Sequence, residues 1–266
     1  MHTLDRHIPL GTVANLRDFG GISTPTGTIA PGRVLRSASL AKLDATDGAA
    51  LVSRGVTAVV DFRTAGEISA APDQLPPDIT SSALDVLADS AHAAAAANLA
   101  ELMADPSQFL TLLQGGDAAE LLRDSYRDIV ALPSALEAYR EFFRGLAHGA
   151  HDETVLFHCT TGKDRTGWAA VTLLTIAGAS EADILADYLQ TNRDLLPTFS
   201  PLFARVAAAG VDPDLLIPLL GVDESYLAAA RTEVRTRFGN MSSYISEGLG
   251  LGEPDLAAIR DRLTRD

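Results

Sequence analysis

The stretch that decides the fold is Val155-Leu-Phe-His-Cys-Thr-Thr-Gly-Lys-Asp-Arg-Thr-Gly-Trp-Ala-Ala-Val-Thr-Leu-Leu174. Its first part, Thr154–His158, is apolar and rich in β-branched residues, which predicts a strand in the interior of a sheet. A loop that contains Gly162 follows. A helix is expected to begin near residues 164–166 and to end at Gly178. The stretch therefore predicts a strand, a short loop and a helix in direct succession.

Short strands and longer helices alternate in the rest of the chain, which is typical of an α/β fold. Residues 57–62 and, more weakly, 34–36 are expected to be strands. Helices are expected at 44–55, from a cap at Ser180, at 223–238 and at 253–263.

A helical insert is expected at about residues 88–117, where an unbroken alanine run precedes a group of leucines. Alanine favours helix but buries little area, so the insert would pack loosely on the body of the protein. Two interpretations stay open, namely an ordinary surface helix pair and a mobile lid over a site. With no repeat or linker visible, we expect residues 1–266 to form a single domain.

Composition and charge exclude several classes of function. The chain has 266 residues and a net charge of −14, which disfavours nucleic acid and stable association with an anionic membrane. No apolar run reaches the roughly 20 residues of a membrane span, and no secretory signal is recognisable, so a cytoplasmic protein is expected. A single cysteine and scattered histidines predict no metal site and no cofactor.

The single cysteine lies in the loop of the deciding stretch, with five residues between Cys159 and Arg165. A loop of this length before a helix can turn its backbone N–H groups toward one point and bind a phosphate-type or sulfate-type anion. Arg165 can hold two anion oxygens in bidentate fashion, and the same field stabilises a thiolate. The loop therefore suits attack of Cys159 on a phosphate ester, with a phosphocysteine intermediate.

The segment from His158 to Thr166 resembles the signature of the cysteine-dependent protein tyrosine phosphatase superfamily: His-Cys, five residues, Arg, then Ser or Thr. The Gly-Lys-Asp-Arg-Thr-Gly run is similar to a bacterial branch of that superfamily, typified by a mycobacterial phosphatase. Weaker similarities follow in the family's order at residues 15–21, 36–44, 61–67, 186–192 and 224–230. The resemblance implies a central, mostly parallel sheet flanked by helices.

The resemblance also implies roles for the loop residues. Cys159 would be the nucleophile, and Thr166 would support the leaving thiolate. His158 would orient the loop by hydrogen bonding rather than act as a base. The residues expected to bind phosphate are Thr160, Thr161, Gly162, Lys163 and Arg165.

The resemblance leaves two positions open for the general acid, because many superfamily members use an aspartate on a separate loop. Asp85 and Asp89 are the candidates on such a loop. Asp164 lies inside the cysteine loop, so its distance to a bound phosphate is constrained. We favour Asp164 as the acid–base residue or an essential electrostatic partner, ahead of Asp85.

The expected reaction is hydrolysis of phosphotyrosine, with phosphoserine, phosphothreonine and phosphoinositides as further substrates that the resemblance implies. Lys163 would add positive charge beside the phosphate, or would only pair with Asp164.

Three other interpretations of the loop compete with a phosphatase. The interpretation as a nucleotide-binding P-loop fails, since Phe157 and Asp164 occupy the positions where that motif needs Gly and Ser or Thr. A rhodanese-type sulfurtransferase leaves the Lys-Asp-Arg-Thr run unexplained. A non-enzymatic phosphate-binding module stays open as an alternative function.

A reactive thiolate at Cys159, without a second cysteine to form a disulfide, also predicts that the activity is sensitive to oxidation.

Overall fold

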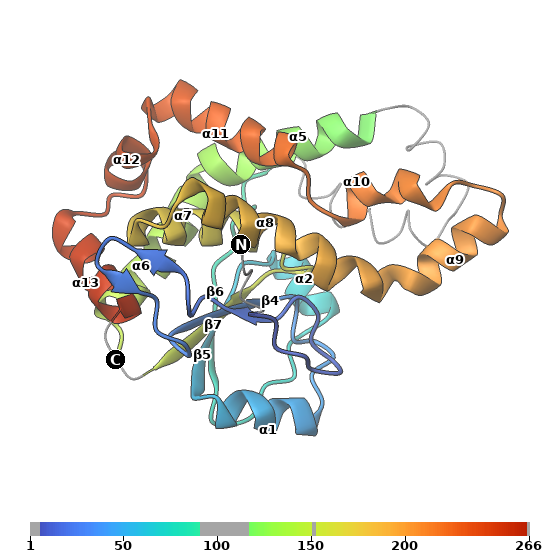
Figure 1. Ribbon diagram of the computed structural model, residues 1–266, viewed down its shortest axis with the longest axis horizontal. Coiled ribbons are helices and arrows are strands. Elements are labelled where there is room, and N and C mark those ends of the chain that lie inside the picture. Colours follow the sequence, from blue (N-terminus) through green and yellow to red (C-terminus); the bar gives the residue numbers. More distant parts are fainter. Residues whose placement is uncertain (1–5, 91–116, 151–152, 265–266) are drawn as a thin grey trace.

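The computed structural model describes residues 6–90, 117–150 and 153–264, and a five-stranded sheet lies at its centre (Figure 1). In spatial order the strands are β1 (Arg17–Asp18), β4 (Val34–Ser37), β7 (Thr154–His158), β5 (Val56–Asp61) and β6 (Thr80–Ala83). β4, β7, β5 and β6 run parallel, and β1 is antiparallel to β4. A hairpin of β2 (Ser23–Thr24) and β3 (Gly27–Thr28) forms a second small sheet. The expected α/β fold with a mostly parallel sheet is confirmed.

Helices cover both faces of the sheet (Figure 1). One face carries α1 (Ala45–Ser53), and α6, α7 and α8 lie on the other, with α5 and α11 stacked beyond them. The remaining bounds are α2 (Ala65–Ala70), α5 (Asp117–Ala131), α6 (Pro133–His148), α7 (Arg165–Ala177), α8 (Glu181–Leu195), η1 (Leu196–Phe199), α9 (Ser200–Ala208), η2 (Pro213–Leu216), α10 (Ile217–Leu220), α11 (Glu224–Phe238), α12 (Met241–Ser243), η3 (Tyr244–Gly248) and α13 (Glu253–Thr264).

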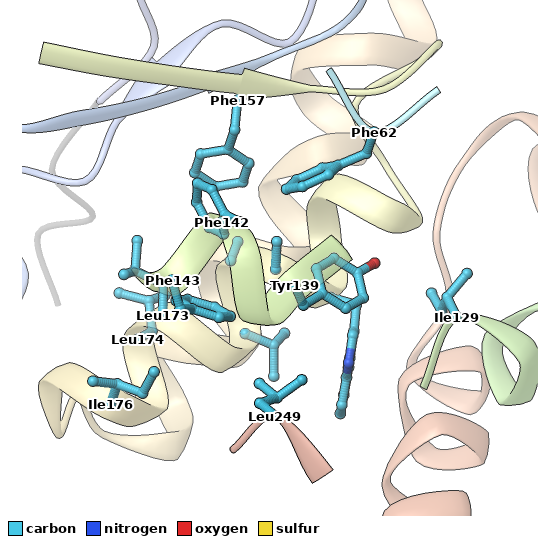
Figure 2. Packing of buried hydrophobic residues seen from close by; sticks show 14 of the residues in the cluster. Phe62, Ile129, Tyr139, Phe142, Phe143, Phe157, Leu173, Leu174, Ile176 and Leu249 are labelled. Carbon is cyan, nitrogen blue, oxygen red and sulfur yellow. The ribbon is translucent and has the colours of Figure 1, made fainter. Parts of the chain in front are cut away.

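The alternation of side chains along β7 divides the core in two. Val155 and Phe157 join the larger core, on the side of α6 and α7, whereas Leu156 joins the smaller core beside α1. Figure 2 shows Phe157 pointing from the strand toward Phe142 of α6, and the two ring centroids lie 4.9 Å apart. The central strand is therefore clamped between two apolar layers, which gives the loop at its end a rigid base.

The strand and helix of the deciding stretch lie where the sequence predicts them, with α7 beginning at Arg165 and its C-cap at Gly178. Asp44, Ser180 and Asp223 are helix N-caps, and each accepts a backbone N–H. β5 begins and ends one residue before the expected 57–62. β6 was not expected, because its sequence Thr-Ser-Ser-Ala is polar and exposed at the sheet edge.

The expected insert at 88–117 falls almost entirely on residues 91–116, outside the described residues, so its form stays a prediction. In the described ranges, no helix is both long enough and apolar enough to cross a membrane.

Candidate active site

The cysteine loop, residues 159–164, joins the end of β7 to the start of α7 at the carboxyl edge of the sheet. β7 is the middle strand, and its parallel neighbours β4 and β5 end beside the loop. Cys159 directly follows the strand and is 1% exposed. Ligands of open α/β sheets bind at the carboxyl ends of the strands, so the loop occupies the position expected of a binding site.

The carbonyl groups of the loop are held from outside it. The amide nitrogen Nδ2 of Asn15 donates to the carbonyl oxygens of Thr161 at 3.2 Å and Gly162 at 3.0 Å. Arg36 Nη2 donates to the same Gly162 oxygen at 2.8 Å. These bonds turn the carbonyl groups away from the centre of the loop.

The backbone N–H groups of the loop, unlike its carbonyl groups, have no hydrogen-bond partner among the described residues. Within the part of the chain that the structure describes, none of the N–H groups from residue 160 to residue 165 donates to another protein atom. Carbonyl groups held outward and N–H groups left without acceptors are the features of an anion-binding nest at a helix N-terminus. The arrangement agrees with the anion cradle that the spacing of the loop predicts.

A buried charge cluster supports the loop from behind. Asp187 of α8 lies 2.8 Å from Arg36, 3.1 Å from Arg17 and 2.9 Å from Arg6. Burial raises the pKa of the Asp187 carboxyl, but these guanidinium groups hold it well below its usual range. Burial and the neighbouring Arg17 lower the pKa of Arg36 to about 10, which still leaves it charged. Three cations around one carboxylate give this region an excess of positive charge, which favours an anion nearby.

Arg165 closes the far side of the loop and pairs with Glu67 of α2. The guanidinium nitrogens Nη1 and Nη2 lie 2.7 and 2.8 Å from the two Glu67 oxygens. Burial raises the pKa of Glu67, but the hydrogen bonds and charge of Arg165, together with bonds from Thr160 and Thr64, lower it to about 2. Glu67 is therefore an anion that fixes both the arginine and the hydroxyl group of Thr160 in the loop.

Lys163 is buried, and its side chain leads toward the end of α10. The ammonium nitrogen Nζ donates to the carbonyl oxygens of Leu219 at 2.6 Å and Gly221 at 3.1 Å. It also lies 3.7 Å from the Asp164 carboxylate. These three partners match the three N–H donors of an ammonium group. In this structure Lys163 ties the cysteine loop to α10.

The acid candidates lie in different surroundings. Asp164 occupies the N-cap position of α7 without a capping bond, and its carboxylate oxygen Oδ1 is buried with no hydrogen-bond partner among the described residues. Asp85 accepts the backbone N–H groups of Leu87 at 3.0 Å and Ala65 at 3.2 Å, which places it at the start of α2. Asp89 instead bonds to Ser134 at the start of α6.

The two supporting residues are completely buried. The hydroxyl oxygen Oγ1 of Thr166 has no hydrogen-bond partner among the described residues, so its donor is available to a group in the loop. Nδ1 of His158 lies 3.1 Å from the carbonyl oxygen of Cys159. This contact agrees with the loop-orienting role that the resemblance implies for His158.

Sequence reasoning assigned no role to several residues that contact the loop or the side chains beside it, namely Asn15, Arg36, Glu67, Asp73 and Asp187. Four of them act only through tertiary contacts that no local pattern encodes. Glu67 did carry a local signal, because Thr64 and Glu67 form a capping box directly after a strand.

The tyrosine phosphatase family model matches residues 8–265 of the chain. A protein of Cupriavidus necator named as a tyrosine-protein phosphatase is 34% identical, over 96% of this chain and 88% of its own length. The triple specificity protein phosphatase PtpB of Mycobacterium tuberculosis is 28% identical, over 92% of this chain and 95% of its own length. A tyrosine-protein phosphatase of Nostoc commune is also 28% identical, over 86% of this chain and 73% of its own length.

These matches agree with the loop geometry and support an enzyme rather than a phosphate-binding module on the same fold. The structure and the comparisons lead to the same conclusion: this chain is a phosphatase that belongs to the tyrosine phosphatase family.

Proposed function

We propose that the protein hydrolyses phosphate monoesters, phosphotyrosine foremost, through a phosphocysteine intermediate and without a metal ion. The observation that carries the proposal is the position of Cys159 at the base of a loop that Arg165 closes and whose N–H groups have no acceptor among the described residues. Nucleophile, anion cradle and cation come from one loop, so the chemistry needs no metal to neutralise the phosphate.

In the proposed first step the Cys159 thiolate attacks phosphorus, the S–P bond forms, and the bond to the leaving oxygen breaks. Asp164 gives its proton to that oxygen. In the second step a water molecule gives a proton to Asp164 and attacks phosphorus, and the S–P bond breaks to release phosphate and the thiolate. The hydroxyl group of Thr166, which has no partner within the described ranges, would donate to the sulfur as its negative charge returns.

Phosphoproteins or small soluble phosphoesters are the proposed substrates, ahead of phosphoinositides in a bilayer. The ammonium group of Lys163 already has two carbonyl groups and Asp164 as partners, so it is not free to extend the cradle. The net charge of −14 also opposes docking on an anionic membrane. The name of the Mycobacterium tuberculosis relative indicates that three substrate specificities occur among similar proteins.

Replacing the nucleophile tests the mechanism. Cys159→Ser should lose turnover by several orders of magnitude, yet still bind vanadate, because the backbone cradle does not depend on the sulfur. Residual activity above about 1% would overturn the covalent mechanism. The wild-type enzyme should show the same rate with and without a chelator, whereas a rate lost on chelation and restored by a divalent cation would overturn the metal-independent step.

A substrate panel tests the specificity. Phosphotyrosyl, phosphoseryl and phosphothreonyl peptides and soluble phosphoinositide headgroups are compared by kcat/KM with one enzyme preparation. The highest value is expected for the phosphotyrosyl peptide. A higher value for a phosphoinositide would reverse the proposed order.

A further inference from the structure

His158 has a hydrogen-bond acceptor beside each of its ring nitrogens. Nδ1 lies 3.1 Å from the carbonyl oxygen of Cys159, and Nε2 lies 3.0 Å from the carboxylate oxygen Oδ2 of Asp73. The imidazole ring is completely buried, so water does not take the place of either partner. Nε2 lies close to Asp73 but makes no well-aligned hydrogen bond within the described residues.

A neutral imidazole does not fit these two partners. It carries one N–H group and one lone pair, and here the lone pair would face either a carbonyl oxygen or a carboxylate at about hydrogen-bond distance. Both arrangements are repulsive, and no water can relieve them in a buried site. Only a ring with a proton on each nitrogen presents a donor to both oxygens.

The charges around the ring also balance only when His158 is protonated. Asp61 lies 3.8 Å from Nδ1, and Arg63 lies 2.7 Å from Asp61 and 2.9 Å from Asp73. Two carboxylates then face two cations, Arg63 and His158. Burial raises the pKa of Asp73, but its contact with His158 and the charges of His158 and Arg63 lower it below the usual value, so Asp73 is an anion.

The same three residues, Asp61, Asp73 and His158, are a group whose ligand atoms lie within 4.8 Å of one another, as a metal site requires. The guanidinium group of Arg63, however, already contacts both carboxylates from within the protein. Arg63 therefore supplies the cation of this cluster, and the geometry favours a buried ion-pair cluster over a metal site.

We propose that Asp73 is a positioning residue, which keeps His158 protonated on both ring nitrogens and so fixes the carbonyl group of Cys159. The protonated ring holds this carbonyl away from the anion cradle and places a positive charge next to the nucleophile. Asp73 also accepts the backbone N–H of Leu40 at 3.0 Å, so its carboxylate is held in place by the segment after β4. The proposal rests on the proposed function of Cys159 as a thiolate nucleophile.

Two measurements that need no substrate test the proposal. The first is the nitrogen NMR spectrum of the His158 ring in histidine-labelled wild-type protein at pH 7, where both nitrogens should carry protons. The second is the rate of alkylation by iodoacetamide against pH. Because Cys159 is the single cysteine of the chain, this rate has one source.

Asp73→Asn offers His158 an amide that can donate to Nε2, so the variant tolerates a neutral ring. One ring nitrogen should then lose its proton at pH 7, and the midpoint of the alkylation profile should rise by about one pH unit. Asp47→Asn is the matched control, since Asp47 is also a buried carboxylate but bonds to Thr12 instead of His158. Its spectrum and profile should match the wild type.

A wild-type His158 ring with one unprotonated nitrogen at pH 7 would overturn the proposal, and this measurement stands even if Asp73→Asn fails to fold. An alkylation midpoint that is the same in Asp73→Asn and wild type would overturn it as well. Absence of turnover with every phosphoester would instead overturn the proposed function and would leave both of these readouts intact.

Discussion

Glu67 and Arg165 face each other edge to edge, so that the carboxylate takes one N–H from each of the terminal nitrogens Nη1 and Nη2. The carbonyl oxygen of Phe62 accepts a further bond from Nη1 at 3.3 Å. The N–H groups that remain are those of Nε and the second one of Nη2. These two form a parallel fork, which is the geometry that binds two oxygens of a phosphate group. Glu67 thus orients the arginine before a substrate arrives.

This pairing predicts how stability depends on pH. The pKa of Glu67 falls from an ordinary value of 4.5 to about 2 in the folded protein, so its anion stabilises the fold above pH 4.5. That contribution is lost as the pH falls from 4.5 toward 2. Glu67→Gln should therefore be less stable than wild type at pH 7, by about 1–3 kcal/mol, and the difference should shrink as the pH falls.

Urea unfolding at a series of pH values between 7 and 3 measures the difference between the two proteins. Glu181→Gln is the control, because Glu181 pairs with Arg231 at the surface and should change stability by less than about 1 kcal/mol. A Glu67→Gln deficit that is equal at pH 7 and pH 3 would contradict the ionic contribution of Glu67.

Gly162 makes a second prediction, because its α-carbon packs against the backbone of β4. A Cβ there would lie 2.2 Å from the carbonyl oxygen of Ser37, and φ is +69°. Gly162→Ala should push the loop away from β4 and lower kcat/KM by about 100-fold. Its stability should fall by roughly 1–3 kcal/mol more than backbone strain alone explains.

Gly32→Ala is the control that separates backbone strain at positive φ from the steric clash of a Cβ with β4. Gly32 has a similar φ of +78°, but a Cβ there meets nothing within 4 Å. This variant should lose only the roughly 1–2 kcal/mol of a left-handed alanine and keep its kcat/KM. If both variants behave alike in urea unfolding and in turnover, the contact with Ser37 has no special effect on the loop.

The contrast between Cys159 and Glu67 shows how far the sequence alone could lead. The proposed nucleophile Cys159, the proposed anion cradle and Arg165 lie within seven consecutive residues, so the sequence alone predicts that they are close together. Glu67 is 98 residues from Arg165 and acts through the packing of α2 on the loop. The direction of Lys163 also depends on a contact with Leu219, 56 residues away, so the sequence left its role open.

Oxidation provides a third prediction. A thiolate at Cys159 would react with peroxide to form a sulfenic acid, and no second cysteine exists to trap that state as an internal disulfide. Peroxide should therefore inactivate the enzyme, and dithiothreitol should restore activity only after brief exposure. Inorganic phosphate, which does not react with peroxide, should slow the loss by occupying the proposed anion cradle. Full recovery after long exposure, measured as turnover, would contradict unprotected oxidation of this thiolate.

The last prediction distinguishes Asp164 from Asp85 as the general acid. Asp164 is fixed at the start of α7, beside Arg165, and one of its carboxylate oxygens is buried without a partner among the described residues. Both oxygens of Asp85 already accept backbone N–H groups. A group that must gain and lose a proton is better served by the unpartnered oxygen, which favours Asp164.

General acid catalysis typically contributes 10²–10⁴-fold, so Asp164→Asn should lose roughly that factor in kcat with an aryl phosphate whose leaving group needs a proton. The loss should shrink with a substrate whose leaving group is much more acidic, because that oxygen departs as an anion. Asp85→Asn should disturb only the loop before α2 and lose little activity with either substrate. If Asp85→Asn shows the dependence on the leaving group and Asp164→Asn does not, the acid lies on the separate loop, and Asp164 serves as a partner of Lys163.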